Sequence, residues 1–311
     1  MSYFAKQKQG VAKLEEILQC GRSKRGEKVS RKNIFEIVSE TFDLSKEISR
    51  MKDLFEKKTI VRMPYSRHYS ILEYVRQEGF SHWRNRGHCV DADDYLSLLN
   101  YQELWKTAAD NAQNFFTLVE IIYNFWYITN RTTNAPYIRD ECGRNFQLLK
   151  TIMDDCLSRY NYKGKYFSDT EQLIVMENNP GATAVAEIVT PQIGREVLRY
   201  NHHLMQGDLK EKKGILLALG SELEPKRKQL KAVNSSLEDG IFFILNNLNL
   251  RHNNTVAGAK NYNKFAAEMD EETTEFWYDE LYQMMLLAYL EMDQAERNEK
   301  VSVLKTMVNS K

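Results

Sequence analysis

The sequence predicts an all-α protein, a two-part helical bundle with long amphipathic helices and at most a minor short strand. Its 311 residues include only 5 prolines and 14 glycines, so long segments lack the residues that interrupt helices. Apolar residues recur at spacings of three and four, which is the period of a helix face. Several of these segments also begin with a side chain that can cap a helix.

The amino-terminal half, residues 1 to 170, is expected to be helical and basic at its start. From Ser30 to Lys58, apolar residues at alternating spacings of three and four predict one long helix. We expect this helix to pack against residues 10 to 20 as a hairpin, with a dimerising coiled coil as the alternative. Residues 59 to 70 show little periodicity, which predicts a connector before a short helix.

The segment "SHWRNRGHCVDADDYLSLL" combines possible metal ligands with acidic residues. His82, His88 and Cys89 could bind a metal, but their spacing matches no established ligand pattern. Asp91 instead precedes an apolar helical run, where a carboxylate accepts backbone N–H bonds and complements the helix dipole. We therefore interpret the segment as a loop and a helix cap, and we expect no metal site and no cofactor.

Residues 102 to 130 form the most apolar predicted helix, and another helix is expected over about residues 137 to 160. Within the first, the run "FFTLVEIIYNFWYI" is interrupted by Thr117, Glu120 and Asn124 and is too short to span a bilayer. The four cysteines are scattered, which is typical of free thiols in a reducing compartment. The amino terminus has no apolar signal-peptide core. These features predict a cytoplasmic protein with no membrane segment.

The carboxy-terminal half, residues 171 to 311, is expected to begin with the one ambiguous element. "QLIVM" is typical of a short strand and "NNPG" of a turn, so we place the boundary between the halves here. "GREVLRYNHHLMQ" then predicts a helix. Four local signals organise the helices that follow: a cap at Asp208, a break at Pro225, a capping box of Ser235 and Glu238, and a start at Asp270.

Composition and motifs narrow the possible functions. The 43 basic and 43 acidic residues cancel, so net charge gives no sign of nucleic-acid binding. Basic residues are in excess over residues 1 to 70 and acidic residues over 166 to 311. These regions could attract each other, or the basic one could bind phosphates. No P-loop, dinucleotide-binding, nucleophile-elbow or zinc-protease motif occurs, so the enzyme classes built on them have no support.

The stretch "NNLNLRHNN", residues 246 to 254, ends an apolar helical run with polar groups. As a continued helix, it places His252 on the apolar stripe and Asn247, Arg251 and Asn254 on the neighbouring one. Two interpretations stay open. The polar residues could cap a core helix, with one of the last two asparagines in the left-handed geometry. Alternatively, they could form a site, because metal-free cleavage of RNA needs a histidine and a fixed cation.

A second cluster of the same kind occurs in "RYNHH", residues 199 to 203. Arg199, His202 and His203 offer one fixed cation and two groups that titrate near neutral pH. We expect these residues to bind nucleic acid, and they could face the first cluster across the bundle.

The carboxy-terminal third, with "NNLNLRHNN", a loop and then "EFWYDELYQMMLLAYLEMD", resembles the helical abortive-infection proteins of bacteria that carry HEPN-superfamily domains. The resemblance covers about residues 195 to 295. It implies an α-helical bundle, usually dimeric, and the metal-independent ribonuclease activity of many members. In this interpretation His252 is the general acid or base, Arg251 holds the phosphate, and Asn247 and Asn254 orient groups or contact the ribose.

The superfamily pattern places four to six residues between its arginine and its histidine, whereas in "NNLNLRHNN" the two are adjacent. Two other pairs do have the pattern's spacing, Arg62 with His68 and Arg195 with His202, a match that chance alone produces in a chain of this composition. The expected function is a defence or toxicity protein that binds or cleaves RNA. The competing expectation is a non-enzymatic subunit of a multi-component defence complex. It would dock a partner protein, or a second copy, through its acidic, Met- and Tyr-rich final helix.

Overall fold

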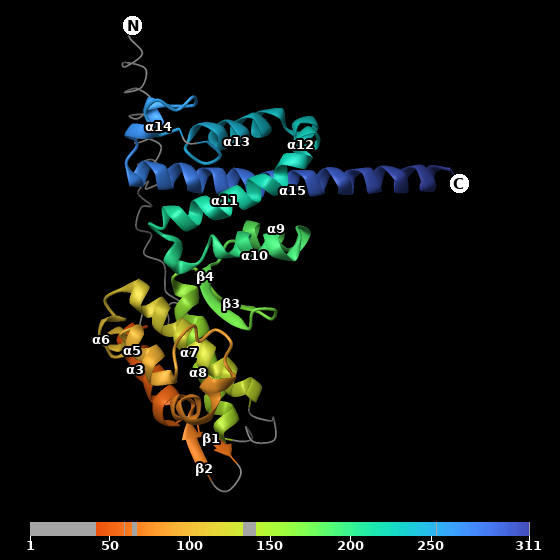
Figure 1. Ribbon diagram of the computed structural model, residues 1–311. Helices are drawn as coiled ribbons and strands as arrows, with labels where there is room; N and C mark the ends of the chain where they lie inside the picture. The colour runs from red at the N-terminus through yellow and green to blue at the C-terminus, as the bar shows by residue number, and fades with distance from the viewer. Residues whose placement is uncertain (1–41, 59, 64–66, 133–140, 253, 311) are drawn as a thin grey trace, which may run out of the picture. The chain divides into compact units, whose positions relative to one another are not determined.

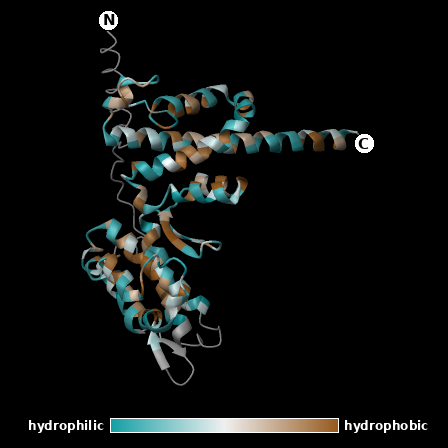
Figure 2. Ribbon diagram, in the orientation of Figure 1, coloured by the Kyte–Doolittle hydropathy of each residue, from teal (hydrophilic) through white to brown (hydrophobic). Residues whose placement is uncertain are grey.

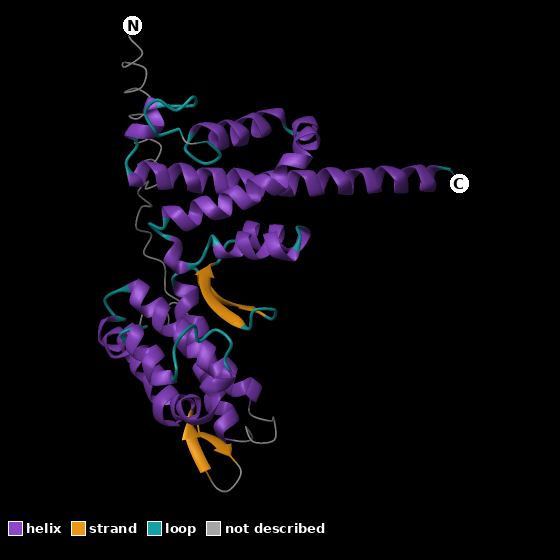
Figure 3. Cartoon of the chain, viewed as in Figure 1, coloured by secondary structure: helices purple, strands orange, loops and turns teal. Residues whose placement is uncertain are grey.

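Most of the described residues are helical, and two small antiparallel hairpins join the helices (Figures 1 and 3). The all-α prediction with minor strands is therefore confirmed. Residues Leu44–Lys311 form one compact unit, which contains every site discussed below. The computed structural model describes residues 42–58, 60–63, 67–132, 141–252 and 254–310.

The first part of this unit packs around a long apolar helix, α7 (Ala112–Thr132), which is buried on almost every side. α8 (Glu141–Arg159) lies against α7, and α3 (Leu44–Asp53) lies against α8. Ile48 and Met51 of α3 are buried, which matches the described part of the predicted amino-terminal seam. The start of that seam and its predicted hairpin partner lie outside the described residues.

Short elements connect α3 to α7. They are a π-helical turn (Leu54–Lys58), β1 (Ile60–Met63), β2 (Arg67–Ser70), α4 (Ile71–Tyr74), a second π-helical turn (Val75–Gly79), a 3-10 turn (Phe80–His82), α5 (Ala92–Leu98) and α6 (Tyr101–Thr107). β1 and β2 pair antiparallel, so the predicted connector contains a hairpin that its weak periodicity did not reveal.

Two side chains explain where the next helices begin. Asp91 accepts the backbone N–H of Asp94 at 2.8 Å and caps α5, which confirms the interpretation of this segment as a helix cap. Asn111 accepts the N–H of Asn114 at 3.1 Å. This second cap starts α7 as a new helix, so the single helix predicted over residues 102 to 130 is in fact two helices.

The predicted strand is confirmed as β4 (Gln172–Glu177), whose four central residues are buried. It pairs antiparallel with β3 (Tyr162–Phe167), which follows the helix expected over about residues 137 to 160 and for which the sequence predicts no strand. The residues of β3 are mostly half-buried and include Lys163 and Lys165. The alternation of apolar and polar residues that predicts a strand is therefore weak there.

A helical bundle follows β4 and surrounds one hydrophobic core. Its longest helix, α15 (Glu271–Asn309), packs against α9, α11, α12 and α13. The other elements are α9 (Pro180–Ile188), α10 (Pro191–Arg199), a 3-10 turn (His203–Met205), α11 (Leu209–Leu223), a 3-10 turn (Glu224–Lys226), α12 (Arg227–Val233), α13 (Ser235–Asn247) and α14 (Lys264–Glu268).

Local signals predicted most helix starts in this bundle. Asp208 caps α11 and Asp270 caps α15, and the chain leaves α11 two residues before Pro225. The predicted capping box of Ser235 and Glu238 is wrong. Asn234 caps α13 by accepting the N–H of Leu237 at 3.0 Å. Glu238 is instead buried and forms an ion pair with Arg227.

Two helices end earlier than the sequence predicted, and both ends carry candidate site residues. α10 ends at Arg199, before the two adjacent histidines, and α13 ends at Asn247, before Arg251 and His252. Among the described residues, no helix combines the length and apolarity needed to cross a membrane.

Candidate functional site

Arg251 lies in the loop after α13, and its side chain holds that loop against α11. The guanidinium forms an ion pair with Glu224, donates to the carbonyl oxygen of Gly220 at 3.1 Å and lies 5.1 Å from the centre of the Phe242 ring. These contacts pair the guanidinium with neighbouring residues, so Arg251 packs the loop against α11.

His252 is exposed. The prediction that it continues the apolar face of a helix is wrong, because α13 ends at Asn247 and the helical spacing does not extend beyond that residue. Asn247 itself donates to the carbonyl oxygen of Phe243 at 2.8 Å, one turn earlier in the same helix. No described contact joins His252 or Asn247 to Arg251, so these three residues do not form a site.

Asn254 is buried within the same loop and joins two parts of it by hydrogen bonds. It is 2% exposed, accepts the backbone N–H of Asn249 at 3.2 Å and donates to the carbonyl oxygen of Asn261 at 2.9 Å. Asn249 has a left-handed conformation, with φ of 55°, and Asn254 does not. The prediction named Asn253 or Asn254 for this geometry, and Asn253 lies outside the described residues. The amide of Asn254 is thus committed to the loop and is not turned toward a ribose.

The second predicted cluster has different surroundings, because it joins the free edge of β4. The backbone N–H of Glu177 donates to the carbonyl oxygen of Asn201 at 2.8 Å, and Met176 pairs with His202 in an isolated antiparallel bridge. Asn201 is further fixed by its side chain, which donates to the hydroxyl of Tyr282 at 2.6 Å. These bonds end α10 and hold the two adjacent histidines in place.

Helix α7 binds the rest of that strand edge with two side chains. Asn124 accepts the N–H of Leu173 at 3.0 Å, and Glu120 accepts the N–H of Val175 at 2.8 Å. Alternate residues of the edge are thereby paired with α7 and with the segment after α10. Glu120 and the adjacent histidines meet at this point, although they are 82 residues apart in sequence.

The Glu120 carboxylate is the centre of the cluster. Its Oε2 atom lies 3.0 Å from Nε2 of His202 and 3.3 Å from Nε2 of His203. The second contact lacks hydrogen-bond geometry, so Nε2 of His203 is buried without a hydrogen-bond partner. On the other side of the ring, Nδ1 of His203 is 3.0 Å from Oε1 of Gln113.

Burial and the neighbouring groups set the protonation of this cluster. Burial by itself raises the pKa of Glu120, but the close contacts and charges of His202 and His203 outweigh it and lower that pKa to about 2. Burial lowers the pKa of His203 more than the carboxylate raises it. At neutral pH the cluster therefore holds an anionic carboxylate beside a neutral His203 imidazole.

His202 lies between two clefts. One, of about 490 Å³, is lined by both histidines, Lys212 and several acidic residues of α15. The other, of about 450 Å³, is lined by His202, Arg195 and Arg199. In this second cleft Arg195 pairs with Asp169, whereas Arg199 pairs with Glu196 at 3.1 Å and Glu211 at 3.3 Å.

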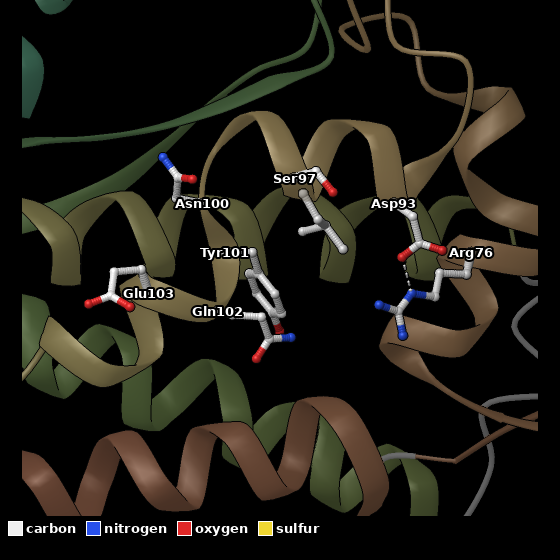
Figure 4. Close-up of a pocket in the computed structure, with 8 residues that line it drawn as sticks. Arg76, Asp93, Ser97, Asn100, Tyr101, Gln102 and Glu103 are labelled. Atoms are coloured by element: carbon white, nitrogen blue, oxygen red, sulfur yellow. Dashed lines mark hydrogen bonds and ion pairs between the residues drawn. The ribbon is translucent and has the colours of Figure 1, made fainter.

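A third cleft, of about 410 Å³, lies beside α5 and α6 (Figure 4). Arg76 and Asp93 face each other across 2.8 Å, while Asn100 and Glu103 lie at its other end. The hydroxyl of Tyr101 donates to Glu56 at 3.0 Å. The ionisable groups of this cleft are spread out and paired, so it is a weaker candidate than the histidine cluster.

The structure thus brings together His202 and His203 but adds two residues that the sequence analysis missed, Glu120 and Gln113. The available signal was Glu120 itself, a single carboxylate inside the most apolar helix of the chain, four residues before Asn124. Among the described residues, no hydrogen bond, ion pair or ring contact joins Arg251 or His252 to this cluster. Comparisons with protein-family models, curated proteins and solved structures find no match for the chain.

Proposed function

We propose that this chain binds RNA, and cleaves it without a metal, in the cleft that His202 shares with Arg195 and Arg199. The observation that supports this proposal best is the 3.0 Å contact of His202 with the half-buried carboxylate of Glu120, next to two arginines that line the same cleft. The resemblance of about residues 195 to 295 to HEPN-superfamily proteins also favours RNA as the substrate. By the same resemblance, the proposed setting is bacterial defence in the cytoplasm, where the free thiols of Cys89 and Cys156 would stay reduced.

The proposed chemistry assigns a separate task to each group. Nε2–H of His202 donates a hydrogen bond to Glu120, which leaves the lone pair of the ring on Nδ1. A carboxylate in this position orients an imidazole for catalysis. Nδ1 takes the proton of the RNA 2′-hydroxyl as its oxygen attacks phosphorus. The bond from phosphorus to the 5′-oxygen breaks, and that oxygen takes a proton from water, which leaves a cyclic phosphate and a free 5′-hydroxyl. The hydroxide formed from that water takes the proton from Nδ1, which restores the neutral imidazole.

The arginines would hold the phosphate and stabilise the charge that grows on it. Their present ion pairs do not prevent this, because the partner carboxylates are partly exposed and two of them, Asp169 and Glu211, lie at the surface. Side chains of Arg199 and Glu211 are 44% and 49% exposed, and ion pairs of this kind contribute little stability. A phosphate can therefore replace a carboxylate partner at low cost.

Fluorescence anisotropy with single-stranded RNA, measured in chelator over a range of salt concentrations, tests the binding. Each of Arg195→Ala and Arg199→Ala should weaken binding and lower the salt slope by about one phosphate contact. Arg297→Ala is the matched control, because Arg297 is an exposed, ion-paired arginine on α15. Equal binding by the wild type and both cleft variants would remove this cleft as the RNA site.

Cleavage is tested separately with RNA and with the same strand carrying 2′-deoxy substitutions. The wild type should release products with cyclic phosphate ends from RNA alone, and His202→Gln should bind RNA but leave it intact. Cleavage of the deoxy strand would contradict attack by the 2′-oxygen. Binding without any cleavage by the wild type would reduce the proposal to RNA binding.

The end of α15 supports a second candidate function, docking of a second copy of this chain. Hydrophobic positions continue into the last turns of the helix (Figure 2), and Val301, Leu304 and Val308 are 46%, 57% and 62% exposed on one side of it. The stretch 293–299 carries an excess of acidic residues and 300–310 only basic ones. An antiparallel pair of these helix ends would place opposite charges beside each other.

Light scattering over a concentration series tests this pairing. A dimer that dissociates on Leu304→Glu, but not on the control Ser302→Glu one face away, would support it. A monomer at every concentration would contradict it.

A further inference from the structure

The cluster of Glu120, His202 and His203 has the geometry of a metal site. We propose that these three side chains bind one divalent transition-metal ion of the zinc class. Their ligand atoms all lie within 4.8 Å of one another, and Oε2 of Glu120 is 3.0 and 3.3 Å from the two Nε2 atoms. Tetrahedral zinc, at about 2.0 to 2.1 Å from each ligand, separates its ligand atoms by about 3.3 Å. A metal ion therefore fits between these atoms with only small side-chain movements.

Nε2 of His203 is the atom that most needs such a partner. The ring is 2% exposed, and Nε2 has no hydrogen-bond partner. Oε1 of Gln113 can only accept a hydrogen bond, so Nδ1 of His203 carries a proton and Nε2 is the ring atom left for a ligand. Nε2 lies 3.3 Å from a carboxylate oxygen of Glu120, in a contact without hydrogen-bond geometry. A cation between these two atoms would bond to both.

The surrounding bonds are those that metal ligands ordinarily have. Gln113 orients His203 through Nδ1, and the backbone N–H of Val175 donates to the Glu120 carboxylate at 2.8 Å. In metal sites, such outer partners fix the tautomer of a histidine and the direction of a carboxylate. Glu120 and Gln113 lie on α7 and Val175 on a paired strand, so rigid elements hold the set.

The site has an open side. Both histidines line the cleft of about 490 Å³, whereas Glu120 is not one of its lining residues. Three protein ligands with access to a cleft leave a fourth position for water or a ligand, the arrangement that distinguishes catalytic from structural zinc sites. Two imidazoles and one carboxylate also suit other first-row divalent metals. The histidine–carboxylate set argues against Mg²⁺ and Ca²⁺, which prefer oxygen ligands alone.

This inference does not rest on the proposed RNA chemistry, and the two make opposite demands on His202. Metal on Nε2 places the ring proton on Nδ1, so a metal-bound His202 cannot accept the proton of a 2′-hydroxyl. The metal-free protein would therefore be the form active on RNA. Zinc binding is measured without RNA and RNA binding is measured in chelator, so either proposal can fail alone.

Calorimetric titration of the full chain with zinc, after removal of metals by chelator, tests the inference. The wild type should bind one zinc ion at the cluster. Cobalt as a second probe should give the strong visible absorption of a tetrahedral site with nitrogen ligands. Glu120→Gln keeps the shape of the side chain but removes the charge, and it should weaken zinc binding about a hundredfold, at the upper end of the losses seen when even outer partners are removed. Gln113→Ala should weaken it about tenfold for the same reason.

Two further proteins make the test decisive. His202→Gln changes the more exposed histidine and avoids the risk that replacing the buried His203 prevents folding. His82→Gln is the control, because His82 is exposed and lies outside this cluster; it should bind zinc as the wild type does. All variants are first matched by circular dichroism. Absence of zinc uptake by the wild type, or equal affinity in the wild type, Glu120→Gln and His202→Gln proteins, overturns the inference.

Discussion

The segments 199–203 and 247–254 have similar compositions but opposite surroundings. Each contains arginine, histidine and asparagine. The first lies on the free edge of β4, where His202 and His203 meet Glu120 of a distant helix. The second forms a loop in which Asn254 bonds its own neighbours and Arg251 binds α11. The comparison teaches that convergence of groups from different elements, and not local composition, distinguishes a candidate site from a cap.

The strand edge is the physical cause of this difference. An unpaired edge offers backbone donors and acceptors that must be satisfied where they are buried. In this chain, side chains of α7 and the backbone after α10 satisfy them. Polar residues are thereby drawn into one buried place. The loop after α13 meets no such edge, so its polar groups satisfy one another.

The largest expected effect follows from replacing Glu120, the residue that His202 and His203 of the first segment contact. Glu120→Ala should lower the free energy of unfolding by about 2 to 4 kcal/mol, because it leaves the N–H of Val175 and His202 without their common, half-buried acceptor. Glu120→Gln, which still offers an oxygen to Val175, should cost less. Urea denaturation in chelator measures both. A loss below about 0.5 kcal/mol for Glu120→Ala would mean that α7 does not hold the strand edge.

A smaller effect is expected inside the second segment. Asn254→Ala should cost about 1 to 3 kcal/mol, because it leaves the N–H of Asn249 and the carbonyl of Asn261 without their partner. Asn247→Ala, at the last residue of α13, should cost less than about 0.5 kcal/mol. Neither change should alter RNA affinity in the anisotropy assay. Loss of RNA binding by a stably folded Asn254→Ala protein would show that the loop is more than a cap.

Sequence reasoning succeeded where one residue controls its own neighbourhood. Asp91, Asp208 and Asp270 cap helices as predicted, and the apolar run at β4 forms a strand. Sequence reasoning failed where a residue's contacts are made with an element far away in the sequence. Glu120 appeared only as an interruption of an apolar helix, because its meaning depends on the backbone of β4.

Helix ends show the same limit. Nothing local in "GREVLRYNHHLMQ" stops a helix at Arg199, since the bonds that end it come from Glu177 and Tyr282. α13 likewise ends where the chain turns back through Asn249 in a left-handed conformation. The predicted helix continues beyond Asn247 and therefore places His252 on an apolar face. The real helix ends at Asn247, so that face does not extend to His252.

The smallest expected effects separate the two segments most directly. Arg251→Ala should cost about 1 kcal/mol, for one hydrogen bond to Gly220 and a partly exposed ion pair with Glu224. His252→Ala should change stability by no more than about 0.5 kcal/mol, because the side chain is exposed and leaves no cavity when removed. Thermal melting measures both.

The same two proteins should keep the RNA affinity and cleavage of the wild type, whereas Arg199→Ala and His202→Gln should lose one or the other. All four are compared in one preparation, so that differences in folded fraction are corrected by the melting curves. Abolished cleavage in His252→Ala, with unchanged melting and RNA binding, would restore the catalytic prediction for the second segment. It would also show that a partner, or a movement of the loop, brings a phosphate to an exposed histidine.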